Sequence, residues 1–215
     1  RVAVKNVKLL DTPKAKYQEA DCLKVLSGKH TAFLKYYGTS VKGSIQNIIV
    51  EVVDGIELYE LLVKKPFSED ETQKWFRQLV EAMMVAHKYH IIHRDLKLEH
   101  ILICGEKLKI IEWGYAVSLK EGPYTNSCGS PHFAPPEILQ IPPIVHEKND
   151  VWSLGVILYS MLTGNSLIDA QKIPELFNRI RNYDFNLDGV PEGAKSLLEK
   201  VLVPIDKRLT CAEIL

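Results

Sequence analysis

"HIIHRDLKLEHILI", residues 90–103, places charged side chains between two apolar segments. Ile91-Ile92 and Ile101-Leu102-Ile103 are short and rich in branched side chains, which is typical of buried strands. Between them, residues 93–100 alternate charged with apolar side chains, but no helical or strand period continues outward. A solvated surface turn is the alternative, yet such turns usually carry Gly, Pro, Asn or Ser, and residues 93–100 have none. The pattern favours a loop held at both ends, with its charged groups directed at a ligand.

The composition is that of an ordinary globular domain. The 215 residues are 46% hydrophobic and 25% charged, which indicates one large domain or one domain in two lobes. The 27 basic residues balance the 27 acidic ones, so we expect no nucleic-acid or membrane partner, and a local site must bind any polyanion. The longest apolar stretch, residues 151–162, is too short to span a bilayer. With no signal peptide, we expect a cytoplasmic protein, a nuclear location being possible.

The cysteines indicate a reducing compartment. Four lie far apart without a C-x-x-C pair, namely Cys22, Cys104, Cys128 and Cys211. We expect reduced thiols, with disulfides or a zinc site as the alternative.

The first quarter of the chain is predicted to be rich in strands. Strands are expected at residues 2–9, 33–39 and 45–53, with a helix at residues 14–26 after the first of them. The chain starts inside a strand pattern and stops at a capping-box spacing, Thr210 and Glu213, that opens a helix. We therefore expect an excerpt of a longer protein.

Helices are predicted to dominate from Asp54 onward. Residues 69–89 have one apolar face, and residues 149–162 are apolar almost all round, which is typical of a buried central helix. Asp54-Gly55 is the expected hinge between the two parts.

The first helix carries one charge, Glu19, in an apolar stripe that also contains Ala15, Cys22 and Leu23. A buried carboxylate needs a cationic partner, and Lys5 on the neighbouring strand is the candidate. The alternative is that Glu19 lies solvated at the rim of the stripe.

The order of motifs resembles the eukaryotic protein kinase family, in particular serine/threonine kinases of the calcium/calmodulin-dependent and AMP-activated-like group. The motifs are "VAVK", "HRDLK", "KIIEWG", "CGSPHFAPPE", "NDVWSLGVILYSMLTG" and "DKRLT". The resemblance implies an α+β bilobal fold, in which residues 1–53 are a partial, β-rich N-lobe without its first strands and Gly-rich loop. Residues 54–215 would be the helical C-lobe, and the two together one kinase domain cut at both ends.

The resemblance implies an ATP site between the lobes. Its expected residues are Ala3, Lys5, Glu19, Val50, Glu51, Val53, Glu57 and Leu102. Lys5 would hold the α- and β-phosphates, oriented by Glu19, and Glu57 would bind the ribose hydroxyls. Val50 falls at the gatekeeper position, and Ala3 and Leu102 would enclose the adenine.

The resemblance also assigns roles in and around the opening stretch. Asp95 would accept the proton of the substrate hydroxyl, while Lys97 would neutralise the γ-phosphate. Scaffold roles are implied for the ion pair of Glu137 with Arg208 and for Asp150, which would hold the catalytic-loop backbone. A stack through both lobes is implied for Leu23, Tyr36, His93 and Trp113.

Both expected metal ligands depart from the family pattern. The family's metal-binding Asp is Glu112, in "EWG", and its Asn is His100. Mg²⁺ requires near-ideal octahedral oxygen geometry, whereas imidazole suits Mn²⁺ or Zn²⁺ better. We expect impaired binding of Mg²⁺ or Mn²⁺, with Mn²⁺ preferred.

Three functions remain open from the sequence. The first is a slow or Mn²⁺-preferring serine/threonine kinase that acts on a protein substrate with ATP. The second is a pseudokinase that acts as an allosteric scaffold for a protein partner, and the third is a degenerate fold that binds no nucleotide. The oligomeric state is not predicted.

The usual activating phosphothreonine is replaced by Asn126. Phosphorylation would then use the flanking Thr125 or Ser127, with Arg94 as the partner of the phosphate. The alternative is that Arg94 pairs permanently with a carboxylate or with loop carbonyl groups, and no switch is needed.

Overall fold

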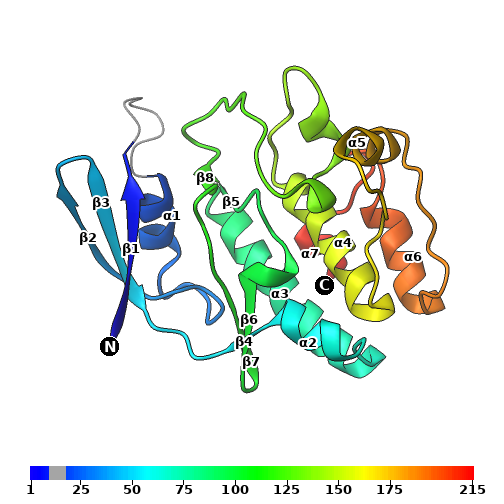
Figure 1. Ribbon diagram of the computed structural model, residues 1–215, viewed down its shortest axis with the longest axis horizontal. Coiled ribbons are helices and arrows are strands. Elements are labelled where there is room, and N and C mark those ends of the chain that lie inside the picture. The colour runs from blue at the N-terminus through cyan, green and yellow to red at the C-terminus, as the bar shows by residue number, and fades with distance from the viewer. Residues whose placement is uncertain (10–17) are drawn as a thin grey trace.

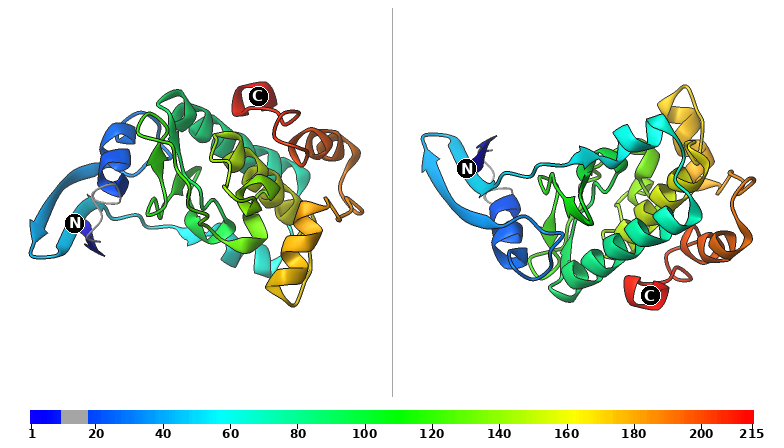
Figure 2. Two further views of the ribbon diagram at one scale, coloured as in Figure 1. Left: turned by 90° about the horizontal axis from the view of Figure 1, so that it is seen from above. Right: turned by 90° about the horizontal axis from the view of Figure 1, so that it is seen from below.

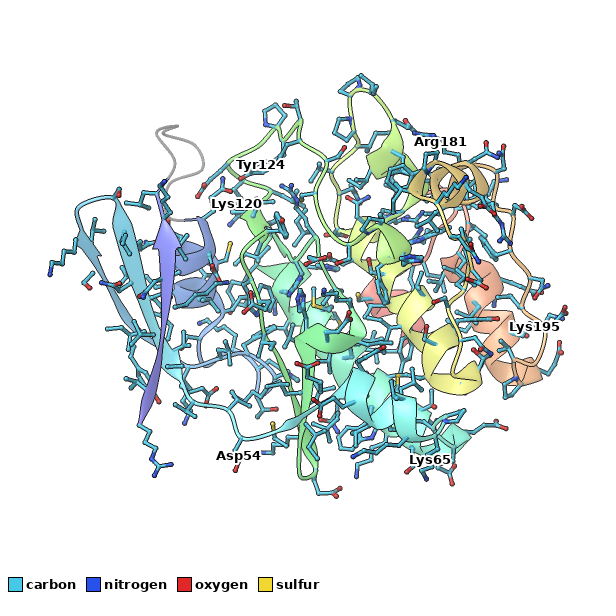
Figure 3. The ribbon with its side chains drawn as sticks, viewed as in Figure 1. Asp54, Lys65, Lys120, Tyr124, Arg181 and Lys195 are labelled. Atoms are coloured by element: carbon cyan, nitrogen blue, oxygen red, sulfur yellow. The ribbon has the colours of Figure 1, made fainter. Side chains whose placement is uncertain are left out.

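The chain forms a small three-stranded sheet with one helix, followed by a larger helical part (Figure 1). The computed structural model describes residues 1–9 and 18–215. The sheet and its helix lie at one end of an elongated molecule, and the helices fill the other end (Figure 2). The predicted α+β architecture is therefore confirmed. Asp54 lies on the connection from the small sheet to the helical part, as Figure 3 shows.

The small sheet is antiparallel, in the order β1-β3-β2. Its strands are β1 (Val2–Lys8), β2 (Tyr36–Lys42) and β3 (Ile45–Glu51). Helix α1 (Gln18–Leu26) contributes Leu23 and Leu26 to the core, together with Ile48 and Val50 of β3. The predicted helix at residues 14–26 is observed from Gln18; its first part, including Ala15, lies outside the described residues.

The start of the second strand was predicted wrongly. β2 begins at Tyr36 instead of residue 33, because the apolar residues Ala32, Phe33 and Leu34 are buried in the loop before it. The carbonyl oxygen of Ala32 accepts a 2.9 Å hydrogen bond from the backbone of Ile110, far along the chain. Branched or aromatic composition thus indicated burial correctly but strand structure incorrectly.

The larger part contains six helices within the described residues. They are α2 (Leu58–Lys64), α3 (Glu69–Lys88), α4 (Lys148–Thr163), α5 (Ile173–Arg181), α6 (Glu192–Val201) and α7 (Cys211–Ile214). Ser68 and Glu71 form a capping box that starts α3, and Thr210 and Glu213 form the predicted one before α7. α4 is buried nearly all round, and a Cβ at Gly155 would approach Val201 Cγ1 to 2.7 Å, so glycine lets α4 lie close to α6.

Short strands frame the site between the two parts. β4 (Ile56–Glu57), β6 (Ile101–Cys104) and β7 (Lys107–Ile110) form one sheet, and β5 (Ile91–Ile92) pairs with β8 (Val117–Ser118). The two apolar doublets of the opening stretch are therefore strands, as predicted. The four cysteines are free thiols. In the part of the chain that the structure describes, no helix has the length and apolar character needed to cross a membrane.

Candidate active site

Asp150 of α4 anchors the loop between β5 and β6 through hydrogen bonds to the loop backbone. The backbone N–H groups of His93 and Arg94 each donate a 2.9 Å hydrogen bond to the Asp150 carboxylate. Arg94 adopts φ 68°, a left-handed conformation that non-glycine residues rarely take. Two charge-assisted bonds from adjacent residues offset that strain. The contact expected of Asp150 is present.

His87 of α3 completes this anchor. Its Nε2 lies 3.0 Å from Asp150 Oδ2, and both side chains are buried. Burial alone would lower the pKa of His87, but its hydrogen bonds to Asp150 and Cys211 raise the pKa to about 10. His87 is therefore an imidazolium cation at neutral pH, and it neutralises the carboxylate beneath the catalytic loop.

His93 is a packed structural residue. Its ring lies 4.6 Å from the ring of Trp113, its Nε2 donates to the carbonyl oxygen of Ile111 at 3.1 Å, and its Nδ1 accepts from the backbone of Asp95. Complete burial lowers the pKa of His93, so the ring is neutral. Leu23 is buried and Tyr36 packs against the same core, and their part in a continuous stack stays a prediction.

Asp95 Oδ1 accepts a 2.7 Å hydrogen bond from the backbone N–H of Ser130. The neighbouring Lys97 is directed toward Glu99, with 3.7 Å between Nζ and Oε1. Asp95 is buried, but its carboxylate keeps acceptor capacity for a substrate hydroxyl.

Lys5 lies between two carboxylates. Its Nζ is 2.8 Å from Glu19 Oε1 and 3.0 Å from Glu112 Oε2. The side chain of Glu19 is 9% exposed, so the predicted inward pair is present and the solvated-rim alternative is wrong. Burial alone would lower the pKa of Lys5, but the hydrogen bonds to Glu19 and Glu112 raise it, so the ammonium stays charged. The contact with Glu112 was not predicted.

The two residues expected to bind a metal ion, Glu112 and His100, differ in exposure. Glu112 adopts φ 59° and its side chain is 51% exposed. The Nδ1 of His100 lies 2.8 Å from the carbonyl oxygen of Asp95, and a carbonyl only accepts, so Nδ1 carries the proton. When the ring is neutral, Nε2 then keeps a lone pair for a metal ion.

These residues alone do not form a complete metal site. Among the described residues, no group of three or more His, Cys, Asp or Glu side chains is arranged to hold a metal ion. Protein sites for nucleotide-bound Mg²⁺ usually supply one or two side chains, and phosphate oxygens supply further ligands. The carboxylate of Glu112 and the imidazole of His100 are ligand types that a nucleotide-bound divalent ion can accept.

The expected adenine-site residues are neighbours across strands. Ala3 pairs with Val50 between β1 and β3, and Glu57 pairs with Leu102 between β4 and β6. Val53 lies in the connection that follows β3.

The side chain of Glu51 holds the end of β3. It accepts from the backbone of Lys35 at 2.9 Å and forms an ion pair with Lys109 of β7. Lys109 also donates to the carbonyl oxygen of Phe33 at 3.0 Å. Lys109 therefore connects the helical part to the small sheet at Glu51, one of the residues expected at the ATP site.

A second buried ion pair joins the segment before α4 to the end of the chain. Arg208 Nη2 donates to Glu137 Oε2 at 3.0 Å, and the Arg208 side chain is 0% exposed. Asn149 adds a 2.8 Å hydrogen bond to the same carboxylate. The predicted pair is present.

The expected regulatory residues lie on or beside the activation segment, which we define as residues 119–130. Thr125 is exposed, and Ser127 Oγ donates to the carbonyl oxygen of Ile138 at 2.8 Å. The guanidinium of Arg94 contacts Cys128 and the carbonyl oxygen of Asn126. Within the described residues, the hydroxyl groups of Thr125 and Ser127 therefore form no hydrogen bond with Arg94.

Sequence reasoning missed His87, Lys109, Cys128 and the Ser130 backbone as parts of the site. His87 sits on the buried face of α3, a signal that a polar residue there needs a partner. The other three had no local signal, because each meets its partner more than thirty residues away in sequence.

Comparison with known proteins identifies the family. The family model for the protein kinase domain matches residues 1–215. The chain is 36% identical over 193 residues to a carbon catabolite-derepressing protein kinase of Candida tropicalis, covering 87% of this chain and 31% of that protein. It is 33% identical over 203 residues to the SNF1-like protein kinase ssp2 of Schizosaccharomyces pombe, covering 92% of this chain and 34% of that protein.

A mammalian relative gives the same result. The serine/threonine-protein kinase SIK1 of Rattus norvegicus is 31% identical over 204 residues, covering 92% of this chain and 26% of that protein. The chain thus spans about a third or less of the length of these three relatives. The chain belongs to the protein kinase domain family, and these relatives are of the SNF1 and AMP-activated-like serine/threonine kinase group.

Proposed function

We propose that the protein transfers a phosphoryl group from ATP to serine or threonine hydroxyls of proteins, slowly and with Mn²⁺ preferred over Mg²⁺. The contact between Lys5 and Glu19, at 2.8 Å, is the observation that supports this most directly. A paired lysine at fixed depth is what phosphate binding in this family requires. Residues 1–53 and 54–215 would act as its two lobes, in a cytoplasmic or nuclear location.

The expected site residues would have separate roles, some in nucleotide binding and others in proton transfer. Lys5 would bind the α- and β-phosphates while Glu19 keeps its ammonium oriented. Asp95 would orient the attacking hydroxyl and accept its proton, and Lys97 would turn from Glu99 toward the transferred group. The His93–Arg94 backbone is fixed by Asp150, so little reorganisation is needed there.

Glu112 and His100 would hold the divalent ion. Such an ion neutralises the charge that develops on the phosphate oxygens. Glutamate reaches one methylene further than aspartate, and imidazole is a better ligand for Mn²⁺ than for Mg²⁺. A misplacement of about 1 Å costs roughly 100-fold in rate, which is why transfer is expected to be slow.

Thermal melting of the full-length protein tests nucleotide binding. ATP with MnCl₂ should raise the melting temperature more than ATP with MgCl₂, because only the folded state binds the complex. Glu112→Asp combined with His100→Asn should reverse the metal preference and raise Mg²⁺-supported peptide phosphorylation by about 100-fold. Asp95→Ala on that background is the control and should abolish the gain. A melting temperature that ignores ATP with either ion would refute the proposal.

The second candidate is a scaffold that binds nucleotide without transferring phosphate. Its support is the 3.0 Å contact between Glu112 and Lys5, which places two carboxylates on the lysine that should meet a polyanion. If the doubly reverted protein binds ATP but stays inert toward any peptide, the scaffold is the better assignment.

A further inference from the structure

Three consecutive residues of the activation segment dock on the catalytic loop. Cys128 accepts hydrogen bonds from the side chain of Arg94, and Gly129 packs closely against the carbonyl group of Arg94. The backbone N–H of Ser130 donates to the carboxylate of Asp95. Residues 128–130 therefore lie directly against residues 94 and 95.

The first contact joins a guanidinium to a thiol. Arg94 Nε lies 3.0 Å from Cys128 Sγ, and Nη2 donates to the same sulfur. Burial raises the pKa of the Cys128 thiol although Arg94 opposes it, so the sulfur is a neutral acceptor. The fork geometry of arginine allows two donors to converge on one acceptor.

Two further neighbours complete the surroundings of this guanidinium. Nη2 of Arg94 donates to the carbonyl oxygen of Asn126 at 3.3 Å, and the guanidinium carbon lies 5.8 Å from the ring centroid of Tyr124. Tyr124 lies on the loop above β8 and β5 in Figure 3. Each of these partners is a neutral group of the same segment, so the charge of Arg94 is stabilised without an anion.

The second and third contacts depend on close approach. Gly129 has φ 97°, and a Cβ there would collide with the carbonyl oxygen of Arg94. This approach brings the backbone N–H of Ser130 to 2.7 Å from Asp95 Oδ1. A donor at that distance fixes the rotamer of the carboxylate and leaves Oδ2 for other partners.

We propose that Cys128 is a positioning residue, which latches the activation segment to Arg94 without phosphorylation and so holds the Ser130 N–H against Asp95. The docking of the segment does not depend on the proposed function; only its consequence for phosphoryl transfer rests on it. The latch takes the place of the missing phosphothreonine at Asn126. Ser127 supports it, since its hydroxyl is already bonded to the carbonyl oxygen of Ile138 at 2.8 Å.

Hydrogen exchange of the nucleotide-free, full-length protein tests the latch. The protein is produced in bacteria and treated with phosphatase, and mass spectrometry verifies that Thr125 and Ser127 carry no phosphate. In this wild-type protein the Ser130 amide should be protected. Cys128→Ala should speed its exchange by about tenfold or more, because a bond to a charged group is lost.

The matched variants separate positioning from general destabilisation. Cys128→Ser keeps an acceptor for the guanidinium and should retain most of the protection, while Cys104→Ala, on β6, should change nothing at Ser130. The melting temperature of Cys128→Ala should stay close to that of the wild type, since the segment lies at the surface. If Cys128→Ala does not fold, Arg94→Lys removes the fork while keeping the charge and should expose the same amide.

Two results would overturn the latch. One is equal protection of Ser130 in the wild type and in Cys128→Ala without phosphate. The other is a Ser130 amide that becomes protected only after Thr125 or Ser127 is phosphorylated. Either result leaves the ATP-binding proposal untouched, because no nucleotide is present in the measurement.

Discussion

Charged side chains are paired in different ways on two sides of the loop that joins β5 to β6. Below the loop, the carboxylates of Asp150 and Glu137 are buried and each has a dedicated cation, His87 or Arg208. In front of the loop, Lys5 shares two carboxylates, and the outer one, Glu112, is half-exposed.

The difference accounts for one of the two departures from the family pattern, Glu112. Removing one partner of a buried pair leaves an uncompensated charge, which typically costs about 3–5 kcal/mol. Exposed pairs contribute about 0–1 kcal/mol, so their residues can change without unfolding the protein. Glu112 belongs to such an exposed pair, whereas the side chain of His100 is 13% exposed and contacts the carbonyl oxygen of Asp95.

The largest expected effect comes from breaking the buried pair of Arg208 with Glu137. Arg208→Met should lower the free energy of unfolding by about 3–5 kcal/mol, because the Glu137 carboxylate would remain buried without its cation. Urea denaturation followed by circular dichroism measures this. Arg179→Met is the control, since Arg179 pairs with the exposed Asp184 at 3.2 Å, and it should cost under about 1 kcal/mol. Equal losses for the two variants would contradict the comparison.

The next effect is a pH dependence at His87. At pH 6, His87→Gln should lower the free energy of unfolding by about 1–3 kcal/mol, because a charge-assisted bond to Asp150 is lost. The folded-state pKa of about 10 lies above the ordinary value of 6.5, so this stabilisation is complete below 6.5 and is lost as the pH rises through about 10.

The dependence of stability on pH in the acid range is set by Asp150. Burial alone would raise the pKa of Asp150, but the hydrogen bond from His87 lowers it, so its contribution is present above 3.8 and is lost as the pH falls further. Melting temperatures from pH 2 to 11 check both limbs, with the exposed His132→Gln as control. A difference in melting temperature between the wild type and His87→Gln that stays constant up to pH 11 would rule out a charged pair of His87 with Asp150.

A smaller effect on stability is expected at Glu19. Burial raises the pKa of this carboxylate although Lys5 opposes it, so the charged form is already disfavoured. Glu19→Gln should change the free energy of unfolding by about 1 kcal/mol or less. The same variant should reduce the rise in melting temperature caused by ATP with Mn²⁺, since Lys5 loses its inner partner. A large loss of stability without any change in the ATP effect would show a purely structural role.

The smallest effect is expected at Glu112. Its side chain is 51% exposed, so Glu112→Gln should change the free energy of unfolding by about 0–1 kcal/mol, and less at high salt. Denaturation at low and high NaCl measures it. A loss as large as that of Arg208→Met would mean that the front of the cleft is as tightly coupled to folding as its base.

Several elements followed from local pattern alone. The capping box at Thr210 starts a helix where the spacing predicted it, and the two apolar segments of the opening stretch are strands. The apolar run of α4 predicted a buried central helix. The pairing of Lys5 with Glu19 also followed, because a lone charge in an apolar stripe requires a partner.

The failures have a common cause. Phe33 and Leu34 were predicted to lie in a strand because apolar composition indicates burial, and residues buried in a loop have the same composition. The contact between Glu112 and Lys5 was missed because the two residues are separated by 107 positions and neither has an unusual local setting.

The sequence by itself determined the family and the order of most helices and strands, and it named candidate residues for the chemistry, since periodicity, caps and motif spacing are local properties. Only the tertiary structure decided which charge meets which: Asp150 with His87, Glu112 with Lys5, and Arg94 with the thiol of Cys128. The physical reason is that a side chain takes the best partner that packing brings within about 3 Å, and packing across distant segments leaves no trace in local spacing.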